Sequence, residues 1–570
     1  MSDTDIHKRH ATKESAKDFS VQVEHIYLEP KEMTGWEKFV DSFKPLPQSE
    51  KGAKPQKAMS KLHMRMIALC TGLGTGLLVG AGSKLRSGGP LFLLVAYFIV
   101  GYVMVVPTVN SLGELTVAYP SLNGGFQNYY TKFIDESLGF SLGWNYASQW
   151  LIVISLELVT ASMTIKFWTE SVNEDIWVTI FLFIIITINL FGASGYGRAE
   201  TVMNSLKATM LTGFVIFGLC IDLGAGPKGF IGGRYWRDPG YLPEEAFKGL
   251  CGVFVTSSFS IGGFEFVSVA AADTENPRQA LPAACKLILW RVTVLYLGSL
   301  LFVGLLVPYN SDMLMGAAGS ATHASPYVIA AESNGVRVLP HIINAVILVS
   351  VTSVATASMY STPRLMVSLA EQGFAPKWMG YIDKTGRPLF GWIFTIFTSF
   401  FAYIAVYKHQ ETVFNWMLSI SGLSFILIWL FICICHLRFR AVLEHRGIPL
   451  DTLGFVSPYG KVGSYLSITI NLLMLIAQFY VSLFPKGSKG KPNANSFFQN
   501  YLGVPVFLFF WAAHKLWTRN WKLFKRVDEI DLDKDRQIYD PEVMELENLE
   551  AAQRFQNAPF WKKALIVLFD

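Results

Sequence analysis

The stretch Thr71-Gly72-Leu73-Gly74-Thr75-Gly76 lies in the middle of an apolar run of the sequence. A second stretch, Ser257-Ser258-Phe259-Ser260-Ile261-Gly262-Gly263-Phe264-Glu265, interrupts a later apolar run in the same way. Glycine inside a helix costs about 0.5–1 kcal/mol relative to alanine, so clustered glycines are reasonable where a helix is meant to open. In lipid, an opened backbone must find partners or line a cavity. We therefore predict two broken membrane-spanning helices.

The two breaks predict a binding site made of backbone groups. A half-helix that begins at a break presents unpaired N–H groups to a carboxylate, and a half-helix that ends there presents carbonyl groups to an ammonium. Together they suit the two charged ends of an amino acid. The alternative is close packing of small residues, for which the spacing of Gly72 and Gly76 is also suitable. The predicted substrate-binding residues are Thr71, Gly72, Gly74, Thr75, Gly76, Phe259, Ser260, Ile261, Gly262, Gly263 and Phe264.

Apolar runs of spanning length recur along the whole chain. Hydrophobic residues make up 51% of it and charged residues only 16%, which favours lipid as the solvent. A spanning helix needs roughly 20 mostly apolar residues. The predicted fold is therefore an all-α integral membrane protein with about twelve transmembrane helices. The runs fall near 64–83, 91–118, 142–168, 175–193, 200–222, 248–271, 285–308, 336–361, 389–407, 413–435, 461–484 and 497–518.

The interrupted runs open two successive blocks of five, residues 64–222 and 248–435. Gly-interrupted spans in matching places predict a transporter built from two inverted repeats, here with broken helices 1 and 6. Residues 461–518 would add two further helices. Residues 1–63 and 519–570 would form the N-terminal and C-terminal tails.

The distribution of lysine and arginine predicts the orientation of the chain. An even number of spans places both tails on one side. Lysine and arginine gather in both tails and in the connections after the sixth, eighth and tenth runs, whereas 309–335 contains neither. The positive-inside rule then places both termini in the cytosol.

Four charged residues inside or at the ends of predicted spans are candidates for proton coupling or gating, because a charge there costs roughly 2.5–3.5 kcal/mol on insertion scales. Glu265 would carry the coupling proton or hold the broken segment through hydrogen bonds. Lys207 would release a proton reversibly or extend to the headgroups. Glu157 suits a proton relay and an interhelical hydrogen bond equally. Glu114, near a helix end, would form an inner-gate ion pair or take part in coupling.

Other classes of protein lack support in the sequence. It contains no nucleophile–base motif, no His/Cys set at metal-ligand spacing and no P-loop, so we expect no enzyme, no metal and no cofactor. The net charge of +5 gives no indication of nucleic-acid binding. The six cysteines lie in or beside apolar runs and are expected to be buried small hydrophobes. His323 and His341 are expected to be structural.

Further motifs resemble those of the fungal amino-acid permeases of the amino acid–polyamine–organocation (APC) superfamily, most closely the general amino-acid permease branch. The resemblance runs from about residue 30 to residue 555. Besides the first break, it rests on Ser111-Leu112-Gly113-Glu114-Leu115, Glu157-Leu158-Val159-Thr160-Ala161-Ser162, Tyr235-Trp236-Arg237-Asp238-Pro239-Gly240, Leu306-Val307-Pro308-Tyr309-Asn310 and Asp383-Lys384-Thr385-Gly386-Arg387-Pro388-Leu389.

The resemblance implies import of amino acids by proton symport at a fungal plasma membrane, with endomembranes as transit sites. It implies that Lys207 replaces the sodium ion of sodium-driven relatives. The partners would be an amino acid, protons, membrane lipid and ubiquitin ligase machinery acting on tail lysines such as Lys8, Lys13 and Lys17. One departure is Phe264, where a small residue is expected, so the pocket would be narrower and broad specificity is in question.

Two alternatives stay open at this point. The cargo would be a modified amino acid or an amine, such as S-methylmethionine or a polyamine, or the chain would be an amino-acid receptor with little flux.

Overall fold

The computed structural model describes residues 34–45, 61–120, 122, 125–169, 171–271, 276–314, 325–407, 410–560 and 562–563. These residues form helices and contain no β-strand, which confirms the predicted all-α class. The chain divides into two compact units, residues 1–44 and 45–570.

In the first unit, the short helix α2 (Gly35–Asp41) begins with a capping box. The Thr34 hydroxyl accepts a hydrogen bond from the Glu37 backbone N–H at 3.3 Å. The Glu37 carboxylate in turn accepts one from the Thr34 N–H at 2.9 Å. Two N–H groups that a helix start leaves unpaired are thereby satisfied.

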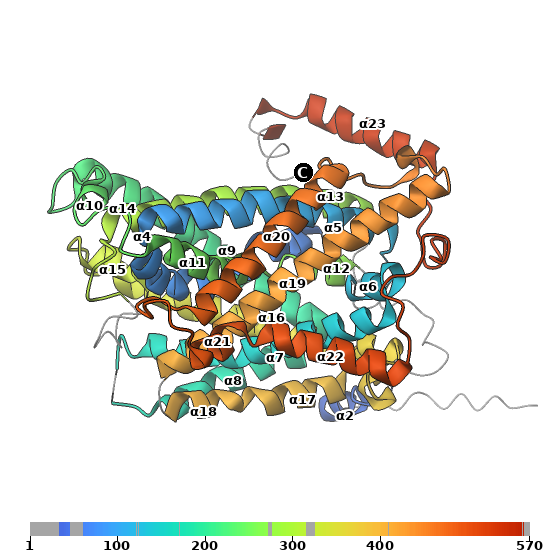
Figure 1. The fold of residues 1–570 in the computed structure, drawn as a ribbon, viewed down its shortest axis with the longest axis horizontal. Helices are drawn as coiled ribbons and strands as arrows, with labels where there is room; N and C mark the ends of the chain where they lie inside the picture. Colours follow the sequence, from blue (N-terminus) through green and yellow to red (C-terminus); the bar gives the residue numbers. More distant parts are fainter. Residues whose placement is uncertain are drawn as a thin grey trace, which may run out of the picture. The chain divides into compact units, whose positions relative to one another are not determined.

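In the second unit every predicted run falls on helical segments, and the long helices pack against one another (Figure 1). The elements of the first block are α3 (Lys61–Cys70), η1 (Gly76–Gly80), α4 (Ala81–Phe98), η2 (Ile99–Val105), α5 (Val106–Ala118), α6 (Gln127–Phe133), α7 (Glu136–Ile165), α8 (Glu174–Leu190), α9 (Gly192–Cys220) and η3 (Ile221–Ala225).

The later elements are α10 (Arg234–Arg237), α11 (Ala246–Ile261), α12 (Phe266–Ala270), α13 (Pro277–Trp290), η5 (Arg291–Gly298), α14 (Ser299–Leu306), α15 (Pro326–Glu332), α16 (Leu339–Glu371), η6 (Lys377–Gly380), α17 (Leu389–Ser399), α18 (Phe401–Tyr407), α19 (Gln410–His445), η7 (Leu450–Thr452), α20 (Gly460–Leu483), α21 (Ala494–Tyr501), α22 (Gly503–Thr518) and α23 (Pro541–Asn557).

Eight helices in the described part of the chain are long and apolar enough to cross a membrane, or nine if the bent pair α21 and α22 forms one span. The first of them joins two predicted runs, because Gly89 adopts a positive φ of 73° before Pro90 and turns the chain from helix 1 into helix 2. The pair α21 and α22 bends by 70°. The count of twelve spans therefore stays a prediction.

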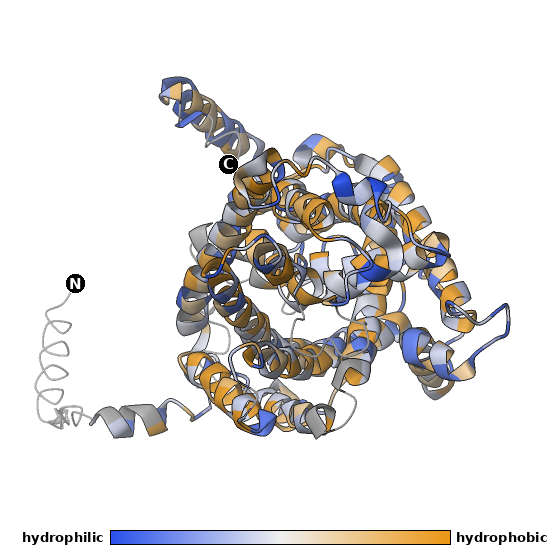
Figure 2. Ribbon diagram, turned by 90° about the vertical axis from the view of Figure 1, so that its left-hand side faces the viewer, coloured by the Kyte–Doolittle hydropathy of each residue, from blue (hydrophilic) through white to orange (hydrophobic). Residues whose placement is uncertain are grey.

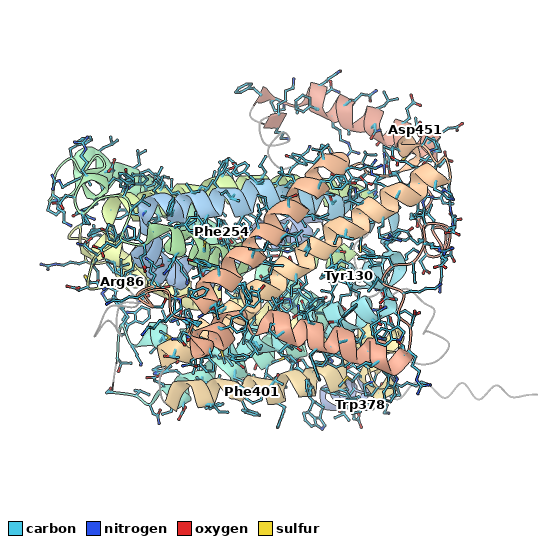
Figure 3. The ribbon with its side chains drawn as sticks, in the orientation of Figure 1. Arg86, Tyr130, Phe254, Trp378, Phe401 and Asp451 are labelled. Atoms are coloured by element: carbon cyan, nitrogen blue, oxygen red, sulfur yellow. The ribbon has the colours of Figure 1, made fainter. Side chains whose placement is uncertain are left out.

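Large apolar side chains on the outer faces of the apolar helices, the shorter α8 and α17 included, are exposed, as expected of a surface that meets lipid. Phe183 is 70% exposed, Phe397 66% and Val462 77%. Figure 2 shows apolar residues along these helices and more polar ones on α23. In Figure 3, Phe401 on α18 lies at the edge of the unit, whereas Tyr130 lies inside it and is fully buried. The chain is a multi-pass membrane protein.

Inside the unit, polar side chains pair across helices. Thr108 and Ser467 are joined at 2.8 Å, and Ser111 and Ser464 at 2.9 Å, which links α5 to α20. The His436 ring of α19 also contacts Ser464, at 2.7 Å. Such pairs satisfy hydroxyl groups that lipid cannot solvate.

Residues 519–540, which we call the C-terminal strap, pack onto the ends of α5 and α6. The backbone N–H of Gln537 donates to Ala118 O at 2.8 Å, and that of Lys525 donates to Ile134 O at 2.8 Å. The Tyr119 hydroxyl donates to Leu532 O at 2.7 Å, and the Leu532 side chain is fully buried. The strap therefore closes one end of the bundle.

We predict that Leu532→Asp frees the strap, because a buried carboxylate without a partner is costly. Trypsin cleavage within residues 519–540 of the solubilised protein should accelerate roughly tenfold or more, since cleavage follows the population of the open form. Ile538→Asp is the matched control, because Ile538 is 77% exposed. Equal cleavage rates for the two variants would contradict the packing of the strap.

Candidate functional site

Both glycine clusters interrupt helices, as predicted. The first helix ends at Cys70 and resumes as η1 at Gly76, with Gly72 at φ +87°. The sixth ends at Ile261 and resumes as α12 at Phe266, with Gly263 at φ +92°. L side chains rarely adopt these φ values, so glycine is required at both positions.

The two breaks lie against each other. A Cβ added to Gly72 would stand 1.9 Å from the carbonyl oxygen of Gly262, and one added to Gly263 would stand 3.3 Å from the backbone nitrogen of Gly72. Gly72 and Gly262, which are 190 positions apart in the sequence (262 − 72), are thus in backbone contact. The two sequence stretches from which the binding site was predicted are therefore brought together at one place.

The remaining glycines of the first break also permit close approach. A Cβ on Gly76 would stand 2.5 Å from Ser260 Oγ and 2.7 Å from the Phe259 ring. A Cβ on Gly74 would stand 2.7 Å from the Val354 side chain of α16. Small-residue packing and an open backbone, the two alternatives for Gly72 and Gly76, therefore both occur here.

Thr71 and Thr75 differ in their hydrogen bonding. The Thr75 hydroxyl donates to Glu157 Oε2 at 2.5 Å. The Thr71 hydroxyl is buried and makes no hydrogen bond of ordinary geometry to a described residue. Three further buried oxygens also lack a hydrogen bond of ordinary geometry to a described residue: Ser258 Oγ, Glu157 Oε1 and Glu265 Oε2. Buried polar atoms are normally paired, so four such oxygens on or beside the two breaks are suited to a polar ligand.

Arg291, at the start of the π-helix η5, is a site residue that the sequence analysis missed. Its guanidinium donates to Ile261 O at 3.0 Å and Gly262 O at 3.2 Å, at the end of α11. It also donates to Ala68 O of α3 at 3.3 Å. These half-helix carbonyls, which we expected to meet a substrate ammonium, thus already accept hydrogen bonds from a cation. An arginine within the run 285–308 was the available signal.

Aromatic rings surround the second break. Phe264 is fully buried and stacks on Trp429 of α19 at 5.2 Å between ring centroids. Phe425 packs beside Trp429 at 5.6 Å and would contact any Cβ on Gly262 at 2.6 Å. Phe259 lies 6.3 Å from Phe425. The Phe264 ring therefore packs between the sixth predicted helix, which is α11 and α12, and the tenth, which is α19.

Glu265 and Glu157 are both buried carboxyl groups, and among the described residues neither forms an ion pair. Glu265 Oε1 accepts hydrogen bonds from the Tyr146 hydroxyl at 3.1 Å and the Gly263 N–H at 3.2 Å. It thus holds the second break, while its other oxygen stays unpaired. The hydrogen bond from Thr75 joins Glu157 of helix 3 to helix 1.

Lys207 is fully buried, which contradicts the headgroup alternative. Helix α9 begins at Gly192, so Lys207 lies about four turns from its start by the 3.6-residue period. Its ammonium donates to Ser353 Oγ at 2.7 Å, and that hydroxyl donates to Glu200 Oε2 at 2.8 Å. The sequence analysis missed Glu200 because it placed this residue at the end of the span.

Glu114 lies in a buried ion pair, away from the breaks. Its carboxylate contacts Arg440 through two pairs of atoms, each 2.6 Å apart, and lies 3.2 Å from His436 Nε2. It also accepts the Ser457 N–H at 2.7 Å. The cluster links α5 to α19, so the ion-pair alternative for Glu114 describes its contacts, while a gating role stays a prediction.

The other expected residues have ordinary roles or lie outside the described part. His341 accepts a hydrogen bond from Trp168 Nε1 at 2.9 Å, which suits a structural role. His323 lies outside the described residues, as do Lys8, Lys13 and Lys17. Five of the six cysteines are buried, and Cys220 is exposed. Within the described ranges no cluster of His, Cys, Asp or Glu could hold a metal ion.

Comparison with known proteins shows that most of the chain is similar to one protein family. Residues 63–527 match the family model "Amino acid permease". The chain is 47% identical to the general amino acid permease AGP1 of Saccharomyces cerevisiae over 515 residues, which are 90% of this chain and 81% of that protein. It is 45% identical to the yeast high-affinity glutamine permease, over 92% of this chain and 80% of that one. It is 43% identical to the yeast general amino-acid permease GAP1, over 92% and 90%.

We predict that Gly72→Ala abolishes ligand binding and uptake. The positive φ alone costs an L side chain about 1–2 kcal/mol, and the Cβ would stand 1.9 Å from Gly262 O. Gly213→Ala, in helix α9 with nothing within 4 Å of the added Cβ, is the control and should keep wild-type uptake. Radiolabelled uptake per molecule at the cell surface is the measurement. Wild-type uptake by Gly72→Ala would show that the break geometry is dispensable.

Proposed function

Because this chain belongs to the amino acid permease family, we propose that it imports amino acids across the plasma membrane of a fungal cell by proton symport. The observation that supports this proposal most strongly is the contact between the two helix breaks. An amino acid carries a carboxylate and an ammonium whatever its side chain. The opened N–H groups are donors for the carboxylate, and the unpaired side-chain oxygens on or beside the breaks are acceptors for the ammonium. The relatives named above are two general amino-acid permeases and a glutamine permease.

Proton coupling requires a group that can lose its charge inside the protein. Glu265 is our first candidate, because it touches the second break and forms no ion pair among the described residues. Glu157 occupies a similar place beside the first break through Thr75. A proton bound to either acid removes a buried charge that would otherwise be costly. Bound substrate and bound proton would therefore favour each other through these shared breaks.

Lys207 and Glu114 take different parts in this proposal. Lys207 supplies a fixed ammonium behind the first break, connected through Ser353 to Glu200, where a sodium-driven relative would hold its ion. Glu114 and Arg440 form the inner gate, because their ion pair links helix 2 to helix 10. We also propose that both termini lie in the cytosol, in keeping with the lysine and arginine pattern.

The proton gradient is large enough for this work. A proton that moves inward across about 100 mV gains about 2.3 kcal/mol. One unit of pH adds about 1.4 kcal/mol. The sum, about 3.7 kcal/mol, sustains accumulation of a neutral solute by roughly 500-fold.

The first test is uptake in a permease-deficient yeast cell that expresses this chain. A labelled amino acid is offered, and each of the twenty standard amino acids competes in turn. Uptake that collapses when a protonophore is added would support symport, and the competitors would define the substrate range. Binding without uptake would instead indicate a receptor.

We predict that Glu265→Gln removes proton-driven accumulation, because an amide cannot bind and release the coupling proton. Accumulation by the wild type should rise as the external medium is acidified, whereas that of the variant should stay near equilibration at every pH. Glu444→Gln is the control, since its carboxylate is 65% exposed and lies at the end of α19. Wild-type accumulation by Glu265→Gln would exclude Glu265 as the proton carrier.

We predict that replacing Lys8, Lys13, Lys17 and the other lysines of residues 1–63 with arginine prolongs life at the cell surface. Arginine keeps the positive charge but cannot accept ubiquitin. The half-life of the surface protein should increase at least about twofold after a nitrogen-rich shift, with uptake per molecule unchanged. An unaltered half-life would refute ubiquitin attachment to this tail.

A further inference from the structure

Arg291 is a fully buried cation without a carboxylate partner among the described residues. Its hydrogen bonds go to the carbonyl groups of Ala68, Ile261 and Gly262 and to the Tyr296 hydroxyl. The three carbonyls lie at the C-terminal ends of two half-helices, where helix dipoles place partial negative charge. Among the described residues, the hydrogen-bond acceptors of Arg291 are thus three backbone carbonyls from two helices and one tyrosine hydroxyl.

The π-helix η5 (Arg291–Gly298) explains how two side chains of one helix, Arg291 and Tyr296, both reach the C-terminal end of α11. A π-turn bonds residues five apart, so it brings Arg291 and Tyr296 to one side of helix 7. Arg291 Nη2 lies 2.9 Å from the Tyr296 hydroxyl, which itself donates to Ser260 O. An α-helical turn would separate the two side chains around the helix. The π-turn therefore allows both side chains to form hydrogen bonds with the end of α11.

The two half-helices that Arg291 joins reach the centre from opposite sides of the membrane. Helix α11 packs along η1 and α4, which follow the first break, whereas α12 packs against α3, which precedes it. Helices 1 and 6 are therefore antiparallel. It follows that α3 and α11 are the two halves that face opposite ends of the bundle.

We propose that Arg291 interlocks the half-helices α3 and α11, so that neither leaves the centre alone. The inference rests on the proposed transport function, because an alternating-access protein must move its two ends in a coupled way. In this role Arg291 is a positioning residue. It keeps the two breaks in register, and it makes the opening of one side depend on the position of the other.

The test uses Arg291→Lys and Arg291→Gln in the full chain. Lysine keeps the charge but offers one ammonium in place of a planar fork, so it cannot reach both helix ends. Arg364→Lys is the matched control, because Arg364 donates to Tyr360 O of its own helix at 3.3 Å and stacks on that ring at 3.7 Å. We expect KM for amino-acid uptake to rise roughly tenfold in both Arg291 variants, as for a loss of about 1.4 kcal/mol, with surface amounts retained.

A second measurement needs no substrate. Cys70 is the last residue of α3 and is fully buried, so its reaction with N-ethylmaleimide reports release of α3. Cys435 of α19, also fully buried, serves as the internal reference in the same sample. We expect labelling of Cys70 relative to Cys435, followed by mass spectrometry of peptides, to rise roughly tenfold in both Arg291 variants and not in Arg364→Lys.

Each result decides the proposal. A rise confined to Cys70, together with the higher KM, supports the interlock. Unchanged labelling and KM in Arg291→Lys would overturn it, and so would equal labelling of Cys70 and Cys435 in that variant, which would mark a general folding role. Failure of the wild type to take up any amino acid would defeat the proposed function instead, because the Cys70 measurement stands without transport.

Discussion

Two backbones meet at the centre of this protein, where the α-carbon of Gly72 faces the carbonyl of Gly262 and the backbone nitrogen of Gly72 lies beside the α-carbon of Gly263. Lipid tolerates no unpaired peptide group, so a helix interrupted in the bilayer must be completed by its surroundings. Here the surroundings are the second interrupted helix and the side chains behind it, notably Arg291 and Ser350, whose hydroxyl donates to Leu73 O at 2.6 Å. Each break is thus completed partly by the other break and partly by these side chains.

The buried charges divide according to how they are satisfied. Glu114 has Arg440 and His436, and Lys207 has a hydroxyl bridge to Glu200, so these charges are held in fixed pairs. Within the described part of the chain, Glu157 and Glu265 accept hydrogen bonds from neutral donors, and one oxygen of each lacks a hydrogen bond of ordinary geometry. A buried charge that is paired stabilises a conformation, whereas an acid with only neutral donors can exchange a proton at lower cost. The structure therefore separates the buried charges that have charged partners from the buried acids that have neutral donors, a distinction that the sequence does not contain.

The sequence allowed the breaks to be predicted, because glycines clustered in an apolar run weaken a continuous helix at that point. It also allowed Glu157 and Glu265 to be identified, since a charged residue within an apolar run can be recognised from the sequence alone. It could not indicate that Arg291 reaches both half-helices, because that depends on a π-turn that apolar periodicity does not reveal. Glu200 was missed for a simpler reason, as helix α9 begins at Gly192 and not near residue 200. Phe264 was expected to narrow the pocket, but its stacking on Trp429 depends on helix 10, far away in sequence.

Under the proposed function, specificity would come from the side chains around the two breaks and not from the backbone groups between them. Every amino acid presents the same two charged groups, and a receptor made of backbone groups cannot distinguish one side chain from another. The side chains that approach the first break are Phe259, against Gly76, and Val354, against Gly74. Both are apolar, and Phe425 extends the same surface beside Phe259. Such an apolar surface favours substrates that bury carbon atoms against it. It disfavours a charged group only through the free-energy cost of removing that group from water. The apolar surface would therefore favour neutral side chains and discriminate weakly among them, since one methylene is worth only about 1–3 kcal/mol.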